Sequence, residues 1–143
     1  MAEQRQLDPP ATGPSRVSSM SIATLGAAKV ALGVGCIVAP QLTGRIFLME
    51  IATESVLMAR LFGSSCAALG AATWNMNKQV GRMNVGKENL KTLVMFNITA
   101  DIVDVLSCTA GYVSGTYGLP AFAMLGGGCL ILAVLGIVGH QGI

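Results

Sequence analysis

The stretch Asn97-Ile-Thr-Ala-Asp101-Ile-Val-Asp104-Val-Leu-Ser-Cys108 places two carboxylates inside a segment that is otherwise apolar enough to span a membrane. A charged residue at the centre of a membrane helix costs about 2.5–3.5 kcal/mol on the insertion scale. Asn97, Asp101 and Asp104 occupy positions i, i+4 and i+7, so they share one face of a helix. We therefore predict that this polar face points toward other helices or a water-filled cavity rather than toward lipid.

The composition of the whole chain is typical of an integral membrane protein. Of its 143 residues, 52% are hydrophobic and only 11% are charged, and the mean hydropathy is +0.64. The net charge of +2 comes without a basic run, and only 5% of the residues are aromatic, which excludes nucleic acid as a partner. The predicted fold is all-α, an integral membrane four-helix bundle.

Four apolar segments predict four membrane-spanning helices, because about 20 apolar residues cross a hydrocarbon core of about 30 Å. The predicted spans are residues 20–39, 54–74, 90–113 and 119–138, which together form one domain, 20–143. Residues 1–19 contain several Pro and Ser and no apolar period, so they predict a disordered cytosolic tail. The predicted connections are an amphipathic segment, 41–53, a polar loop, 75–89, and a short turn, 114–118.

Basic residues are concentrated on one side of the predicted membrane. Arg45 is alone on one side, whereas the tail and the region before the third span carry Arg5, Arg16, Lys78, Arg82, Lys87 and Lys91. The positive-inside bias then predicts an antiparallel bundle with both termini in the cytosol. We expect a multi-pass protein of the endoplasmic reticulum.

Small residues recur at every fourth position of the first two spans, a pattern that lets helix backbones approach closely. The two stripes are Ala27, Ala31, Gly35 and Ala39, and Ala59, Gly63, Ala67 and Ala71. The four cysteines, Cys36, Cys66, Cys108 and Cys129, fall one in each span, with no CxxC pair and no His at metal-ligand spacing. They are predicted to pack as small hydrophobic residues, and neither a metal nor a cofactor is expected.

Two cations fall at depths similar to those of the two carboxylates. Counting about 1.5 Å per residue from the span ends places Lys29 level with Asp101, and Arg60 near Asp104 on the lumenal side. Four unpaired charges would cost about 10–14 kcal/mol on the insertion scale, so we expect them to pair. Asp101 is predicted to pair with Lys29, and Asp104 to lie nearer Arg60. Glu54 either caps its helix or joins the site through Arg60.

Two carboxylates one helical turn apart do not ionise independently, so the pair can hold one proton between them. One would act as an acid and the other as a base, with the assignment open. Arg60 would stabilise a developing oxyanion, Asn97 would orient a water or a substrate oxygen, and Lys29 would tune the pair. This set is similar to the Asp-Arg-Asp set, with a water-orienting Asn, of the limonene-type epoxide hydrolases. The similarity is one of chemical groups only, since those enzymes are soluble α+β proteins.

Short motifs in the first half of the chain carry a family resemblance. They are Gly33 to Pro40, Arg60-Leu-Phe-Gly63 and Ala68-Leu-Gly70. In them the chain resembles the DoxX-like and related fungal families of small four-span membrane proteins. The resemblance implies a four-helix membrane bundle in which Arg60 matches the recurring second-helix Arg, and fungal members often look like parts of biosynthetic gene sets for lipophilic metabolites. The Asp101/Asp104 pair has no place in that pattern.

These observations lead to a first hypothesis of a membrane-embedded acid/base enzyme, of the epoxide hydrolase, cyclase or isomerase type, working without a cofactor. The expected partners are a lipophilic oxygenated small molecule and membrane lipid, with a homo-oligomer left open. The expected catalytic residues are Asp101, Asp104 and Arg60, and the expected positioning residues are Asn97, Lys29 and Glu54. The alternatives are a non-catalytic membrane subunit or scaffold and a proton-linked carrier, which is hard to reconcile with four helices lacking a duplicated half.

Overall fold

Five α-helices and one 3-10 turn follow one another in this computed structural model, which describes residues 14–83 and 86–143. They are α1 (Arg16–Val38), α2 (Pro40–Ile46), the 3-10 turn η1 (Thr53–Ser55), α3 (Val56–Met83), α4 (Lys87–Val113) and α5 (Leu119–Gln141). Four segments, namely α1, η1 with α3, α4, and α5, are long and apolar enough to cross a membrane. The predicted all-α, multi-pass membrane protein is confirmed. Residues 1–13 of the predicted tail lie outside the described residues.

All four long helices extend beyond one end of their predicted spans, α1 and α3 by the most residues. α1 begins at Arg16 because Ser15 caps it, with the Ser15 side chain accepting a hydrogen bond from the Ser18 amide at 3.1 Å. α3 continues to Met83, so the predicted loop 75–89 is wrong over most of its length. Hydropathy falls after Trp74, but the helix persists, and Lys78 one turn later places its ammonium 5.1 Å from the Trp74 ring centroid. A polar helical extension cannot be distinguished from a loop by hydropathy.

Glycines set the close crossing of α1 and α3. A Cβ atom added to Gly63 would lie 2.7 Å from the Gly33 carbonyl oxygen, and one added to Gly70 would lie 2.7 Å from the Gly26 carbonyl oxygen. Both helices thus use glycines seven residues apart, which is the spacing that keeps one seam facing a partner along two helical turns. The two backbones touch where no side chain separates them.

The predicted small-residue stripe of α1 is therefore wrong for the crossing with α3, although its member Gly35 does meet Thr43 of α2, and the stripe of α3 is half right. Ala27 and Ala31 are exposed, while Gly26 and Gly33 occupy the crossing. On α3, Ala67 does contact the position of Gly33. A repeat of four residues drifts around a helix of 3.6 residues per turn, whereas a repeat of seven stays close to one face.

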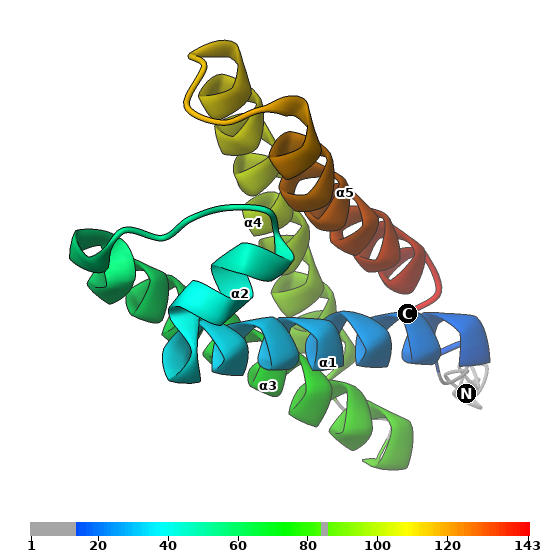
Figure 1. The fold of residues 1–143 in the computed structure, drawn as a ribbon. Coiled ribbons are helices and arrows are strands. Elements are labelled where there is room, and N and C mark those ends of the chain that lie inside the picture. The colour runs from blue at the N-terminus through cyan, green and yellow to red at the C-terminus, as the bar shows by residue number, and fades with distance from the viewer. Residues whose placement is uncertain (1–13, 84–85) are drawn as a thin grey trace, which may run out of the picture.

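All four long helices meet at the end where α1 begins and α5 ends. A core cluster there joins Ile22 of α1, Val80 of α3 and three residues of α4, with Ile143 packed against it; the α4 residues are Leu90, Val94 and Ile98. The Ser15 amide donates a 3.0 Å hydrogen bond to the Gly142 carbonyl oxygen. The start of α1 and the end of α5 accordingly lie side by side (Figure 1).

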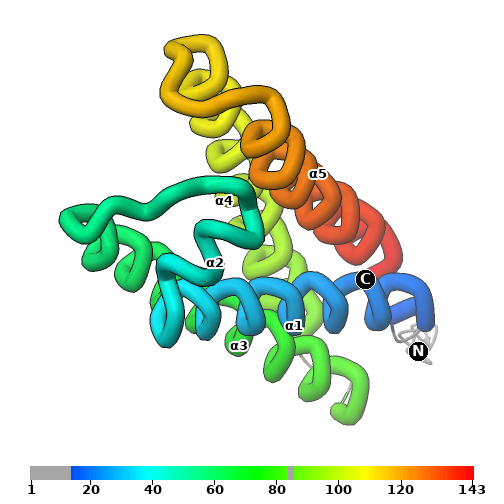
Figure 2. The backbone as a smooth tube through the Cα atoms, viewed as in Figure 1, coloured from blue at the N-terminus to red at the C-terminus, as the bar shows by residue number. Residues whose placement is uncertain are grey.

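The opposite end of the molecule is open. α4 and α5 form a second pair whose connecting turn stands away from α1 and α3 (Figure 1). α2 folds back on α1, where Thr43 is buried against Gly35, and the chain then runs as an open arch to α3 (Figure 2). The arch and α2, together with α1, α3 and α5, enclose an apolar groove beside the centre of the molecule.

Candidate functional site

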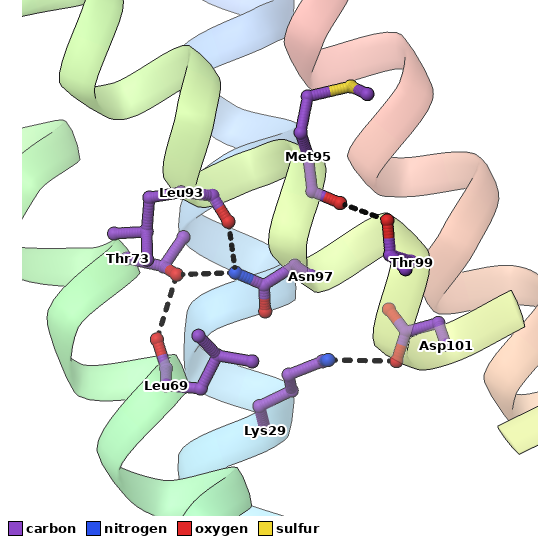
Figure 3. Close-up of polar contacts among 8 residues, drawn as sticks. All are labelled: Lys29, Leu69, Thr73, Leu93, Met95, Asn97, Thr99 and Asp101. Carbon is purple, nitrogen blue, oxygen red and sulfur yellow. Dashed lines mark hydrogen bonds and ion pairs between the residues drawn. The ribbon is translucent and has the colours of Figure 1, made fainter. Parts of the chain in front are cut away.

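A buried ion pair joins the middle of α1 to the middle of α4 (Figure 3). The Lys29 Nζ atom lies 2.8 Å from Asp101 Oδ1, and the two side chains are only 4% and 2% exposed. The pairing predicted from their matching depths is confirmed. With water excluded, each charge depends on the other for its compensation, so neither group can be removed alone without a large cost.

Asn97 lies one turn before Asp101 and links α4 to α3. Its Nδ2 group donates to Thr73 Oγ1 at 2.9 Å and to the Leu93 carbonyl oxygen at 2.9 Å. Thr73 Oγ1 in turn donates to the Leu69 carbonyl oxygen at 2.8 Å (Figure 3). Asn97 is fully buried, as the polar-face prediction requires.

Thr73 is a site residue that the sequence reasoning missed. It is fully buried, in the same seam of α3 as Gly63 and Gly70. A search for a seven-residue repeat in α3 would have found this seam, since Gly63, Gly70 and Asn77 follow it and Thr73 falls between its members. A threonine hydroxyl can donate to its own helix and accept from a neighbour at the same time.

Two buried oxygen atoms of this cluster have no hydrogen-bond partner within the described residues: Asn97 Oδ1 and Asp101 Oδ2. Buried acceptors are normally satisfied, and each exception costs about 1–3 kcal/mol, so a specific unsatisfied pair calls for an explanation. Figure 3 shows Asn97 and Asp101 on successive turns of α4, with Lys29 approaching from α1. Both acceptors thus belong to one small region of the interior.

Asp104 is only half-buried and makes no ion pair or hydrogen bond with the residues the structure describes. Its electrostatic partner is Lys29, which acts on it at longer range than on Asp101. The predicted approach of Arg60 to Asp104 is wrong, because Arg60 is exposed in the second turn of α3 and forms no ion pair there. Depth along a helix, which the prediction used, does not give the direction in which a side chain points.

Glu54 also lies away from the cluster. It is exposed in η1, and neither a capping hydrogen bond nor an ion pair with Arg60 occurs among the described residues. Both predicted roles for Glu54 are therefore absent from residues 14–83 and 86–143. The site that the structure brings together consists of Lys29, Asn97 and Asp101, with Asp104 beside them.

The groove next to this cluster has a volume of about 540 Å³, within the range of small-molecule sites. Residues of α1, α2, α3, α5 and the arch between α2 and α3 line it, including Leu32, Cys36, Phe47, Phe62, Leu125 and Cys129. None of the six predicted site residues lies in its wall. Cys129, however, belongs to the wall and is within electrostatic range of Asp104 and Asp101. α5 thus contributes to the groove wall a side chain that is also near the carboxylates.

The cysteines pack as predicted for small hydrophobic residues. All four are free thiols, with Cys36 buried and the other three half-buried. Within the part of the chain that is described, no three His, Cys, Asp or Glu side chains gather closely enough to hold a metal ion. The chemistry argued below uses only carboxyl, ammonium and amide groups.

Together these features define an integral multi-pass membrane protein with a buried Lys–Asp pair at its centre. Comparisons with protein-family models, with curated proteins and with solved structures gave no match. The resemblance to the DoxX-like families therefore stays a prediction from the first-half motifs alone.

Replacing Thr73 with valine is expected to lower the free energy of unfolding by about 1–2 kcal/mol, because Asn97 loses an acceptor in a buried setting. Circular dichroism during detergent-induced unfolding measures the change. Thr99→Val is the matched control, since the exposed Thr99 hydroxyl bonds only to Met95 of its own helix at 3.0 Å. An equal loss in both variants would contradict a link between α3 and α4 at Thr73.

Proposed function

We propose that this protein is a membrane-embedded acid/base enzyme that opens, hydrates or cyclises a lipophilic oxygenated molecule such as an epoxide. One observation carries the proposal. The buried Lys29–Asp101 ion pair and the neighbouring Asn97 together hold two acceptor oxygens without a hydrogen bond, beside an apolar groove of about 540 Å³. Buried ion pairs can often be replaced by apolar residues without loss of stability. A charge set maintained inside a membrane therefore favours a working site.

The surroundings of the two carboxyl groups suit them to different roles, one as a base and the other as an acid. Lys29 at 2.8 Å favours the ionised form of Asp101, which suits a base. Asp104 makes no ion pair with the described residues and interacts with Lys29 only at longer range, so in an apolar setting its carboxyl group is better suited to the neutral acid form. In the proposed reaction Asp104 therefore supplies a proton, and Asp101 removes one.

In the proposed reaction a water molecule donates one O–H group to Asn97 Oδ1 and the other to Asp101 Oδ2, the two oxygens that lack a hydrogen bond within the described residues. For an epoxide, the water oxygen attacks one ring carbon as its C–O bond breaks. Asp104 then protonates the leaving oxygen while Asp101 takes the proton of the attacking water. The product is a diol, and transfer of the proton from Asp101 to Asp104, one turn away, restores both groups.

The apolar body of the substrate occupies the groove in this proposal. Its oxygenated end points toward the carboxylates from the part of the wall that contains Cys129. Gly128, next to Cys129 on α5 and also in the groove wall, has open space where a Cβ atom would be, so this part of the helix leaves room at the groove. An entry from the lipid phase suits a substrate that dissolves in the membrane.

Replacing Asp104 with asparagine is expected to reduce turnover by at least about 100-fold, the typical contribution of one acid/base group. The measurement is conversion of a panel of terpenoid and polyene epoxides by protein reconstituted in nanodiscs. Asp101→Asn should lose activity as well, and it also breaks the ion pair. Asp104→Asn is the cleaner test, because Asp104 makes no ion pair with the described residues.

The matched control is Glu88→Gln, which removes an exposed carboxylate from the same helix, far from the groove wall. It should leave turnover within about twofold of the unmodified protein, as expected for a surface substitution. Full activity in Asp104→Asn and Asp101→Asn, with any epoxide that the protein converts, would overturn the enzyme proposal.

We propose that the helices are antiparallel and that both termini lie on the cytosolic side of the endoplasmic reticulum membrane. The hydrogen bond between the Ser15 amide and Gly142 supports it, because it keeps the two ends of the described chain together. The basic residues Lys78 and Arg82 at the end of α3 and Lys91 at the start of α4 add the positive-inside bias.

A second candidate, a non-catalytic subunit, is favoured by Arg60. This arginine is exposed on a membrane-spanning helix and has no ion pair in residues 14–83 and 86–143. A partner helix carrying a carboxylate would satisfy it. Co-purification from native membranes separates the candidates: a hetero-complex lost in Arg60→Gln supports the subunit, whereas an active protein without a partner supports the enzyme.

A further inference from the structure

A second cavity, of about 230 Å³, opens beside the apolar groove and differs from it in chemistry. It is lined by Gln41 and Arg45 of α2 and by Glu50 and Ile51 of the arch that follows. This segment connects two candidate membrane spans, so it lies at the level of a membrane surface. Polar side chains line this cavity, while the deeper groove is lined almost entirely by apolar ones.

The two cavities are neighbours, because Ile51 belongs to the walls of both. Ile51 packs closely against Gly44 of α2, since a Cβ atom at Gly44 would be only 2.7 Å from Ile51 Cγ1. The chain turns sharply in between, where Leu48 takes a left-handed φ of 58° and the Met49 amide donates to the Gly44 carbonyl oxygen at 2.9 Å. This turn brings Glu50 back beside α2.

Arg45 and Glu50 carry opposite charges in the wall of one small cavity, yet they form no ion pair with each other. Both side chains are exposed and so are accessible from the membrane surface. A guanidinium group binds phosphate through paired hydrogen bonds, and a carboxylate binds an ammonium group. The pattern complements a head group that carries a phosphate and an ammonium.

We propose that the molecule bound in the groove is a single-chain amphiphile of the surrounding bilayer, with a zwitterionic phosphate–ammonium head group held by Arg45 and Glu50. Its acyl chain passes Ile51 and fills the apolar groove toward Cys129. This inference rests on the proposed function for the role of the groove, and it narrows the substrate class from oxygenated lipophilic molecules in general to a single-chain lipid with an oxygenated chain and a charged head group.

Photo-crosslinking in nanodiscs tests the head-group site. The probe is a lysophosphatidylethanolamine with a diazirine in its chain, compared with lysophosphatidic acid of the same chain, which lacks the ammonium. Arg45→Gln is expected to lower crosslinking of both probes by about tenfold, since both carry the phosphate. Glu50→Gln should lower crosslinking of the ammonium-bearing probe but raise that of lysophosphatidic acid, because it removes a like charge.

Arg60→Gln is the matched control, since Arg60 is also an exposed arginine but lies in neither cavity wall. It should leave both probes unchanged. The inference is overturned if Arg45→Gln and Glu50→Gln crosslink both probes like the unmodified protein, or if an uncharged monoacylglycerol competes as well as lysophosphatidylethanolamine does.

Asp104→Asn separates this inference from the proposed function. Head-group binding that depends on Arg45 and Glu50 should persist in Asp104→Asn, because Asp104 lines neither cavity. Binding with this dependence, in a protein that converts no oxygenated lipid, would refute the enzyme and leave the lipid site. Turnover that requires Asp104 but is indifferent to Arg45 and Glu50 would refute the head-group site alone.

Discussion

Replacing Lys29 with methionine is expected to lower the free energy of unfolding by about 3–5 kcal/mol, the cost of leaving one charge of a buried pair uncompensated. Asp101 would keep its place in an interior where its side chain is only 2% exposed. Methionine fills a volume close to that of the lysine stem, so the loss reports on charge rather than on a cavity. Unfolding in mixed micelles, followed by circular dichroism, measures it.

The double variant Lys29→Met with Asp101→Leu should regain most of the lost stability, because two apolar side chains replace the pair without leaving a buried charge. Lys91→Met is the matched control. Its partner Glu88 lies 3.3 Å away on the surface of the same helix, and exposed pairs contribute only about 0–1 kcal/mol. If Lys29→Met were no more destabilising than Lys91→Met, the buried pair would not exist in the membrane.

The Lys29→Met and Asp101→Leu double variant also separates structure from function. It should fold but should convert no substrate, since the proposed base is gone. A stable, inactive double variant would show that the charges serve chemistry rather than assembly. A double variant that stayed active would place the chemistry elsewhere in the molecule.

Replacing Gly33 with alanine is the second large effect expected. An added Cβ atom would lie only 2.8 Å from the Ala67 Cβ atom and would press against the α3 backbone at Gly63. Backbone cannot move aside as a flexible side chain can, so the helices must separate. We expect a loss of about 1–3 kcal/mol, the usual range for overpacking, with the upper end favoured by the backbone contact.

Gly127→Ala is the control for the glycine series, because nothing lies within 4 Å of the position of its added Cβ atom. Alanine is the better helix former by about 1 kcal/mol, so this variant should be as stable as the original or more so. The same unfolding measurement serves both variants. Equal stability of Gly33→Ala and Gly127→Ala would contradict the glycine crossing of α1 and α3.

The pairing of Lys29 with Asp101 could be predicted from the sequence because depth in a membrane follows directly from position along a helix. Two opposite charges at one depth have a strong reason to meet, since each is costly alone. Arg60 shows where this reasoning stops. Its depth was compatible with Asp104, but rotation of α3 about its axis turns Arg60 outward, and that rotation is set by the glycine seam.

The groove and the polar cavity could not be predicted, because both depend on how the helices and the arch are placed relative to one another in space. The sequence predicted that 41–53 is an amphipathic connection between two spans, but not that α2 would fold back on α1 through Gly35 and Thr43. Tertiary packing also keeps 75–83 helical, since Asn77 and Val80 are buried against other helices. Neither the contact of Gly35 with Thr43 nor the burial of Asn77 and Val80 changes the hydropathy of the sequence, so hydropathy does not predict them.

The sequence by itself determined the class of this protein, its four spans and the buried pair of Lys29 and Asp101, because hydropathy and charge act along each helix separately. Only the tertiary structure decided which face of each helix turns inward. That choice depends on the Gly26, Gly33, Gly63 and Gly70 crossing, and it separates Arg60 from the carboxylates and leaves the groove beside them. The packing energy that favours one face of a helix over another arises only when a second helix packs against that face.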